Sequence, residues 1–510
     1  MDRRNFLGLS AAAIAAGAGA WSYGSSLRAA EDVTGRQRLA MPPLLDTRQT
    51  GRLSLTALPG ATSFLGGPPL HTAGYNSGFM GPTIVMQNGA LDARLENRLS
   101  EPVTSHWHGL LVPGHHDGGP HTPTEPGKVW ADVMHLNQRP TTAWYHSHTH
   151  GSTARQVYAG LAGVIHYTDG RDDQRGLPST YGVDDLTLVI QDRRFDAAGR
   201  MAYSPDTTDI LNGFHGERML INGQFNAVAV VPRGMVRLRL LNGSNARVYT
   251  LHMSDRRPLH VIGSDGGFLT RPSETSYLRI APGERYEVLV DFASGPPPIL
   301  MSAAGLSAKI LEFATDDSLA PRIVRLPTDL GAEPFTMPDE NMPTRRLSLT
   351  VGGSSNFEVR NSDSGAVQSG HAAHGAHVVA PAKTQMIGAG PNGELGVAMN
   401  DFGINGRAYD ARRIDFQVKL GTYERWLVTG GGAGVAHPFH VHGVHFRIVS
   451  TGGLTPAPEE GGWKDTALIS GQLEIIVRFD HPAPKEAPYM FHCHILEHED
   501  SGMMGQFMVA

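Results

Sequence analysis

The sequence predicts an all-β protein made of three sandwich domains. A chain of 510 residues is too long for one ordinary hydrophobic core. Its 61 glycines and 34 prolines favour short strands joined by tight turns over long helices. Apolar and polar residues alternate along many short runs, such as residues 236–240, which is the pattern of strands with one buried face.

A weak repeat of long period predicts where the domains lie. In three places an alternating strand is followed by an Asn- or Gly-rich turn and then by a histidine-bearing stretch. We therefore expect sandwich domains at residues 45–170, 178–325 and 345–510, separated by Pro- or Gly-rich linkers. Residues 353–398 are rich in Gly, Ala, Ser and His, and we expect a flexible insertion there. One short helix is expected near residues 153–161.

The N-terminus resembles a twin-arginine export signal. Arg3 and Arg4 precede an apolar stretch of small residues, and Ala29-Ala30 offers a processing site. The stretch is too short, and too rich in Ala and Gly, to span a membrane comfortably. We expect residues 1–30 to be a signal peptide for the twin-arginine translocation machinery, and the mature protein to be periplasmic without a membrane anchor.

The net charge limits which partners are expected, and the cysteine content limits the chemistry expected of the thiol. The net charge of -6, with no basic segment, argues against a nucleic acid or an anionic membrane surface as a partner. The single cysteine, Cys493, has no second cysteine for an internal disulfide, so its thiol is either free or a metal ligand. We expect the mature chain to be a monomer.

Four histidine motifs suggest metal chemistry. Histidines two residues apart on a strand point to the same face, so each pair can place two imidazoles side by side. A structural zinc site needs four ligands, and the motifs supply many more. The motifs are His106-Trp107-His108, His146-Ser147-His148, His437-Pro438-Phe439-His440-Val441-His442, and His492-Cys493-His494 followed by His498 and Met503.

The cysteine motif has a second property. On a strand, Cys493 must point to the face opposite His492 and His494, so its sulfur can bind one metal while the two imidazoles bind others. A thiolate, two imidazoles and a weak thioether form the donor set of a blue copper site. Cys493, with His437, His498 and Met503, can supply this set.

The four motifs, in this order, resemble those of the multicopper oxidases, most closely the bacterial periplasmic copper-efflux oxidases and the bilirubin-oxidase-like bacterial laccases. The resemblance covers nearly the whole mature chain, including residues 462–466 and 496–504. It implies three cupredoxin-like Greek-key β-sandwich domains and four copper ions. It also implies a copper-dependent oxidoreductase that takes electrons from a reducing substrate and reduces dioxygen to water.

The resemblance implies a role for each motif residue. A type 1 copper, where the substrate's electron enters, would be bound by His437, Cys493, His498 and the axial Met503. A type 2 copper would be bound by His106 and His440. The type 3 pair would be bound by His108, His146, His148, His442, His492 and His494. This cluster of three coppers would lie between the first and third domains, with the second domain acting mainly as a spacer.

Two acids complete the expected site. Asp117 matches an acidic residue that the family places near the type 2 copper, and Glu499 matches a second acid on the water side. Carboxylates in such positions relay protons or orient coordinating histidines. Cys493, Asp117 and Glu499 are therefore the expected catalytic residues.

Three functions remain open. A laccase-like enzyme would oxidise phenols, aromatic amines or bilirubin-type compounds, and a cuprous oxidase would serve copper tolerance. A non-enzymatic, cupredoxin-like copper-binding or cell-division protein is the third, although that class typically lacks the ligands that are complete here. The efflux oxidases carry a methionine-rich insertion, whereas residues 353–398 contain only Met386, and Ala433 and Val435 replace an acid and a methionine. Thioethers are the natural Cu(I) donors, so the first function is favoured.

Overall fold

The computed structural model describes residues 36–65, 69–197, 199–303, 308–320, 323–339, 341–351, 386–387, 397–398, 402–430 and 435–510. The expected signal peptide at residues 1–30 lies outside the described residues. So does the expected insertion at 353–398, apart from a two-stranded ribbon of β23 (Met386–Ile387) and β24 (Val397–Ala398).

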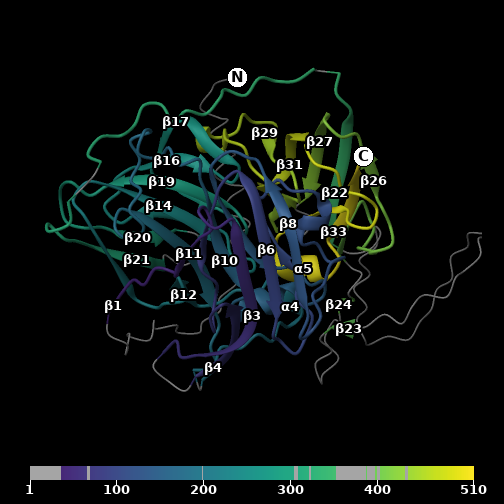
Figure 1. Ribbon diagram of the computed structural model, residues 1–510, viewed down its shortest axis with the longest axis horizontal. Coiled ribbons are helices and arrows are strands. Elements are labelled where there is room, and N and C mark those ends of the chain that lie inside the picture. The colour runs from purple at the N-terminus through teal and green to yellow at the C-terminus, as the bar shows by residue number, and fades with distance from the viewer. Residues whose placement is uncertain are drawn as a thin grey trace, which may run out of the picture. The chain divides into compact units, whose positions relative to one another are not determined.

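The predicted all-β class is confirmed, because strands dominate the described residues (Figure 1). Within that part of the chain the α-helices are short, and one of them lies where a helix was expected, near residues 153–161. They are α2 (Gly114–Asp117), α3 (Thr153–Ala159), α4 (Thr207–Asn212) and α5 (Leu496–Asp500), with a 3-10 turn at Pro458–Glu460. No helix among the described residues is long and apolar enough to cross a membrane.

The first segment, residues 44–167, forms two sheets. One has the order β2-β5-β10-β9-β7 and the other β4-β3-β6-β8. The strands are β2 (Leu44–Asp46), β3 (Arg52–Thr62), β4 (Leu70–Tyr75), β5 (Thr83–Met86), β6 (Gly89–Asn97), β7 (Ser105–His106), β8 (Val129–Leu136), β9 (Thr141–Ser147) and β10 (Ala162–Tyr167).

The middle segment, residues 185–315, forms a second pair of sheets. Their orders are β1-β13-β21-β20-β15-β18 and β12-β11-β14-β19-β16-β17, so the early strand β1 joins the middle segment and not the first. The strands are β1 (Gln37–Arg38), β11 (Asp185–Arg193), β12 (Arg218–Ile221), β13 (Ala227–Val231), β14 (Met235–Asn242), β15 (Tyr249–Met253), β16 (Leu259–Ser264), β17 (Gly267–Thr275), β18 (Leu278–Ile280), β19 (Arg285–Asp291), β20 (Ile299–Ser302) and β21 (Ala308–Thr315).

The third segment, residues 344–509, forms the last pair, with orders β25-β22-β27-β31-β29 and β26-β33-β32-β28-β30. The strands are β22 (Thr344–Val351), β25 (Phe402–Ile404), β26 (Phe416–Val418), β27 (Tyr423–Gly430), β28 (His437–Val441), β29 (Phe446–Thr451), β30 (Thr466–Ile469), β31 (Gly471–Arg478), β32 (Tyr489–Cys493) and β33 (Met504–Val509). Each segment has its own large apolar core. The three-domain division itself remains a prediction.

In strand β14 apolar and charged residues alternate, but neither face of the strand is exposed to solvent. Leu238 and Leu240 lie in the apolar core of the middle segment, but Arg237 and Arg239 on the other face are also buried. The two arginines pair with buried acids, and Arg239 also donates to Thr142 Oγ1 of the first segment at 3.2 Å. An ion-pair cluster therefore fills the junction between the first and middle segments.

We expect Arg239→Met to lower the free energy of unfolding by about 3–5 kcal/mol, because it leaves Asp185 and Glu287 buried without this partner. The matched control is Arg233→Met, which removes an exposed pair with Asp317 and should cost less than about 1 kcal/mol. Urea unfolding of the purified variants measures both changes. Equal losses of unfolding free energy in the two variants would show that the buried ion pairs stabilise the protein no more than the exposed pair does.

Candidate metal centre

Strand pairing brings the four histidine motifs together. In the first segment β7 pairs with β9 so that His106 lies opposite His146. In the third segment β28 pairs with β32 so that His440 lies opposite His492. All ten motif histidines, together with Cys493 and Met503, are at most 1% exposed. The ligand candidates therefore share one buried region although they come from distant parts of the chain.

His437, Cys493 and His498 form the first cluster, called here the Cys493 group. His437 Nδ1 lies 3.4 Å from Cys493 Sγ and 3.3 Å from His498 Nδ1, and Sγ lies 3.7 Å from His498 Nδ1. A point inside this triangle lies about 2 Å from all three atoms, close to the length of metal–imidazole and metal–thiolate bonds. Two imidazoles and one thiolate in a trigonal arrangement fit copper.

Backbone contacts hold the rest of the Cys493 group in place. His498 Nε2–H donates to the Leu211 carbonyl of α4 at 3.1 Å, which leaves Nδ1 free to face the sulfur. The Cys493 N–H donates to the Met503 carbonyl at 3.1 Å, and the Met503 N–H donates to the His498 carbonyl at 2.9 Å. Met503 is therefore fixed beside two of the three residues, and its axial role remains a prediction.

The other eight motif histidines form a second cluster, called here the eight-histidine group. The ring centroids of His108, His146 and His494 lie 5.2–5.6 Å apart. Those of His148, His442 and His492 lie 4.8–5.2 Å apart. The remaining two, His106 and His440, face each other with their Nε2 atoms 3.3 Å apart. The group thus consists of two triads and one pair.

Most of these imidazoles are oriented by a hydrogen bond from the outer nitrogen. An Nδ1–H that donates to an oxygen fixes the tautomer and leaves the Nε2 lone pair for a metal. The Nδ1 atoms of the pair, His106 and His440, lie 2.8 Å from the carbonyl oxygens of Asp117 and Asp465, respectively. Further contacts of this kind are His146 with Ser147 O, His492 with Cys493 O and His442 with Asp117 Oδ2.

His108 is oriented the other way round. Its Nε2 lies 3.0 Å from Asp465 Oδ1, and its Nδ1 has no partner. His146 Nε2, His148 Nδ1 and both nitrogens of His494 are likewise buried without a hydrogen-bond partner in the described structure. Buried polar atoms without partners are rare because each costs about 1–3 kcal/mol, so their concentration here fits a site for metal ions.

Burial also sets the protonation of the ligands. It lowers the pKa of His437 to about 4 and of His494 and His498 to about 3. Burial likewise raises the pKa of the Cys493 thiol. The imidazoles are therefore neutral, which is the metal-binding form, whereas the thiol loses its proton only when a metal ion replaces it.

Asp117 lies between the histidine pair and one triad. Its Oδ2 is 2.6 Å from His442 Nδ1 and 3.5 Å from His106 Nδ1. Asp117 is the last residue of α2, which ends at Gly118 with φ of 79°. A Cβ at Gly118 would lie 1.9 Å from the Ser105 carbonyl oxygen, so only glycine permits this close turn.

Glu499 lies beside the other edge of the same triad. Its carboxylate oxygens lie 3.2 Å from His492 Nδ1 and 3.6 Å from His148 Nε2, and the side chain is fully buried. Burial raises the pKa of Glu499 well above its usual range, and the neighbouring Asp500 adds to the effect. Glu499 therefore keeps its proton to a higher pH than an exposed glutamate does and can give that proton to a neighbour.

A buried ion pair that no sequence motif predicted supports the triad of His108. Arg285 of β19 binds Asp465 through two hydrogen bonds of 2.7 and 2.6 Å, and Asp465 in turn contacts His108. Asp465 could be found from the sequence, because it lies in the stretch at residues 462–466 that resembles the multicopper oxidases. No sequence pattern marks Arg285, because its partner Asp465 lies 180 residues away in the sequence.

The middle segment is more than a spacer. It supplies Arg285 to one cluster and the Leu211 carbonyl to the other. Gly283, with φ of 83°, also lies against the His494 ring, because a Cβ there would lie 2.9 Å from Cδ2 of that ring. The expectation that this segment mainly sets a distance is therefore incomplete.

The protonation states predict how stability depends on pH. Nine of the ten motif histidines have a lowered pKa in the folded protein, so below about pH 6.5 the unfolded chain binds more protons than the folded one. Five buried acids with a raised pKa oppose this effect, because they release protons on unfolding. The histidines outnumber these acids.

We expect the melting temperature of copper-free protein to fall as the pH is lowered from about 7.5 to about 5.5, since each net proton contributes about 1.4 kcal/mol per pH unit. Calorimetry across this range measures the slope. His494→Gln should make the slope shallower, whereas replacing the exposed His71 by Gln should leave it unchanged. A melting temperature that stays level or rises towards acid pH would contradict the expected protonation states.

Comparison with known proteins identifies the family. Three multicopper oxidase family models match residues 58–171, 181–314 and 378–510. Cell division protein FtsP of Salmonella typhimurium is 37% identical over all of this chain and 98% of its own length, and FtsP of Escherichia coli K12 is 36% identical over 100% and 99%.

Solved structures agree with this assignment. A laccase-like multicopper oxidase, CueO from Ochrobactrum sp., is 38% identical with a TM-score of 0.79, covering 92% of this chain and 100% of its own. A multicopper oxidase from Campylobacter jejuni, described as a metallo-oxidase, is 26% identical with a TM-score of 0.76, covering 94% and 96%. The fold is therefore cupredoxin-like, as expected, and the chain belongs to the multicopper oxidase family.

Proposed function

We propose that this chain is an exported oxidase that takes electrons from a small reducing substrate and passes them to dioxygen, releasing water. The observation that carries the proposal is the set of donors: ten histidines and Cys493 lie buried in two clusters, and Met503 is buried with its backbone bonded to Cys493 and His498. The N-terminal sequence of residues 1–30 supports export.

The two clusters would hold four copper ions in different roles. The Cys493 group and Met503 would hold a type 1 copper. His106 and His440 would hold a type 2 copper, and the two triads would each hold one copper of a type 3 pair. Copper bound in this way would supply one-electron oxidation of the substrate at the first cluster and four-electron reduction of dioxygen at the second.

The chain itself connects the two clusters. Cys493 ends β32, and its sulfur lies within 3.7 Å of His437 and His498. His492 and His494, its direct neighbours in sequence, belong one to each triad. A few covalent bonds therefore separate the sulfur from both triads, which gives electrons a short path through the backbone.

Reduction of dioxygen to water also consumes protons. Glu499 holds a proton beside His492 and His148, where it can be released towards the triad. Asp117 accepts a hydrogen bond from His442 and so fixes the orientation of that ring, while its other oxygen has no partner in the described structure. The contacts of Glu499 therefore suit proton transfer, and those of Asp117 suit the orientation of His442.

The environment of the Cys493 group favours an organic reductant. Val435 packs against the apolar core of the third segment two residues before His437, where a Cu(I)-binding site would use a thioether. We infer that phenols, aromatic amines or bilirubin-type compounds are oxidised. Cu(I) oxidation for copper tolerance is the competing function within the family.

A role in cell division is the second candidate. It rests on the relatives named FtsP, which match this chain over its full length at 36–37% identity. The complete ligand set favours the oxidase, because a purely structural protein has no use for buried imidazoles whose nitrogens lack partners.

We expect Cys493→Ser to abolish the blue absorbance of the copper-loaded protein and to remove one copper ion per chain, because the thiolate is lost while the eight-histidine group remains. Visible absorption and metal analysis measure both effects. Met504→Leu, a buried neighbour of Met503, is the control and should stay blue. Unchanged blue absorbance in the serine variant would refute the type 1 assignment.

Oxygen uptake tests the function directly. With copper-loaded protein we expect uptake with a methoxyphenol and with an aromatic amine, and no return of oxygen when catalase is added, because the product is water and not peroxide. Uptake with Cu(I) alone would instead support the cuprous oxidase. A protein without blue colour and without uptake from any donor would favour the division role.

A further inference from the structure

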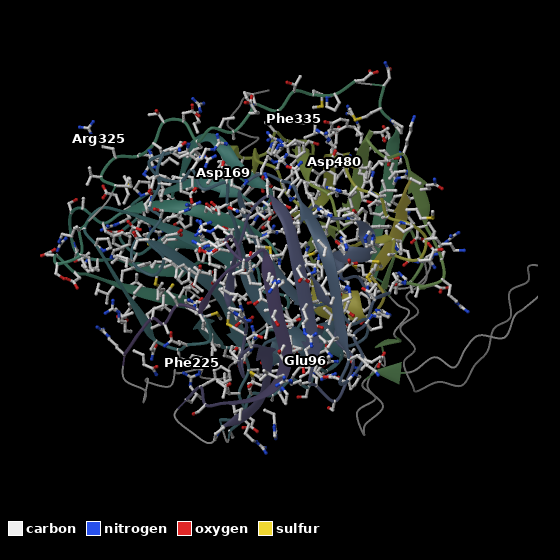
Figure 2. All side chains as sticks on the ribbon, viewed as in Figure 1. Glu96, Asp169, Phe225, Arg325, Phe335 and Asp480 are labelled. Carbon is white, nitrogen blue, oxygen red and sulfur yellow. The ribbon has the colours of Figure 1, made fainter. Side chains whose placement is uncertain are left out.

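A large cavity lies outside the metal centre, where all three segments meet. Its volume is about 1360 Å³, and no motif histidine is among the described residues that line it. Figure 2 labels three of the lining residues, Asp169, Phe335 and Asp480, in the upper part of the view, and they come from distant stretches of the chain. The cavity therefore belongs to neither copper cluster.

Two arginines in this cavity are held by aromatic rings. The Arg139 guanidinium lies 4.6 Å from the Trp463 ring centre. The Arg447 guanidinium lies 5.6 Å from the same ring and 4.9 Å from the Phe335 ring, and the two rings meet edge to face at 5.4 Å. Ring contacts of this kind position a guanidinium while leaving N–H groups at its edge free to donate.

Neither arginine forms an ion pair with an acid among the described residues, although Asp480 acts on Arg139 at longer range and raises its pKa. Arg139 donates only to the Gly266 carbonyl at 3.1 Å and to His445 Nδ1 at 2.9 Å, both of which are uncharged acceptors. Within the part of the chain that the structure describes, Arg447 has the two ring contacts and no ion pair. Burial lowers the pKa of Arg139 to about 10 and also lowers that of Arg447, and both remain charged at neutral pH.

The acids of the cavity offset the charge of Arg139 and Arg447 only in part, because each acid is bound by another arginine or is exposed. Asp169 is bound by Arg171 and Arg175, and Asp480 is bound by Arg478. The remaining acids of the lining, Glu274 and Glu333, are exposed and make no ion pair with Arg139 or Arg447 in the described structure. A partly desolvated pair of cations is thus left facing an open space, which favours a negatively charged occupant.

We propose that this cavity binds a bulky organic anion whose carboxylate or phosphate group accepts hydrogen bonds from Arg139 and Arg447. The volume exceeds what an inorganic ion fills and suits a large organic molecule. Leu111, Phe268 and Leu269 give the wall an apolar part against which the body of such a ligand packs. The site is distinct from the proposed oxidase site, because no residue of the Cys493 group lines it.

Calorimetric titration of the copper-loaded, full-length mature protein tests the proposal with naphthalenedicarboxylate as the probe. We expect binding of one molecule per chain, at least a tenfold loss of affinity in Arg139→Gln and in Arg447→Gln, and partial retention in Arg447→Lys. Arg412→Gln, at an exposed arginine outside the cavity, is the matched control and should bind normally. Thermal melting and the blue absorbance verify that each variant is folded.

Two further measurements make the result decisive. The uncharged diamide of the probe should not bind, and inorganic phosphate should bind more weakly than the probe. On the unmodified protein, the probe should protect Arg139 and Arg447 from phenylglyoxal, read by mass spectrometry, but should not protect Arg412. The proposal would be overturned by any one of four results. These are no probe binding at millimolar concentration, probe affinity in both glutamine variants equal to that of the unmodified protein, binding of the diamide as tight as that of the probe, or tighter binding of phosphate than of the probe.

Discussion

Successive side chains of a β-strand point to opposite faces, and the arrangement of both histidine clusters depends on this constraint. Cys493 faces His437 and His498, whereas His492 and His494 face the eight-histidine group. A slip of one residue between β28 and β32 would exchange these faces. The pairing of His440 with His492, and the 2.7 Å hydrogen bond from His494 N–H to the Pro438 carbonyl, fix the register against such a slip.

Register alone does not orient the imidazoles, and here the junctions between segments matter. Arg285 reaches from the middle segment to Asp465, and Lys464 of the third segment pairs with Asp265 and Glu284 of the middle segment. These ions are all buried, and their desolvation is offset only because each has a charged partner. His108 and His440 of the eight-histidine group contact Asp465, so the position of the middle segment is coupled to the orientation of His108.

The parts of this structure that could be predicted from the sequence are those encoded locally. Strand alternation and turn residues gave the all-β class, and histidine spacing gave the ligand candidates that the structure gathers, because both depend on neighbours in the chain. Arg285 and Leu211 could not be found in this way, since their roles depend on contacts with Asp465 and His498, which are far away in the sequence. Arg237 and Arg239 were equally hidden, because alternation cannot distinguish a solvent face from a face that packs on another segment.

The names of the curated relatives suggest a role in cell division, whereas the chemistry of this site suggests metal binding. The buried nitrogens without partners favour metal binding. A chain without metal would have to tolerate unpartnered atoms on His108, His146, His148 and His494, each at a cost of about 1–3 kcal/mol, with no compensating interaction. Such positions in a purely structural protein would be better filled by apolar residues of similar size. Metal ions remove the cost at all four residues together. Selection on division alone gives no reason to keep this arrangement, so metal binding is the property that accounts for it even where a relative carries another name.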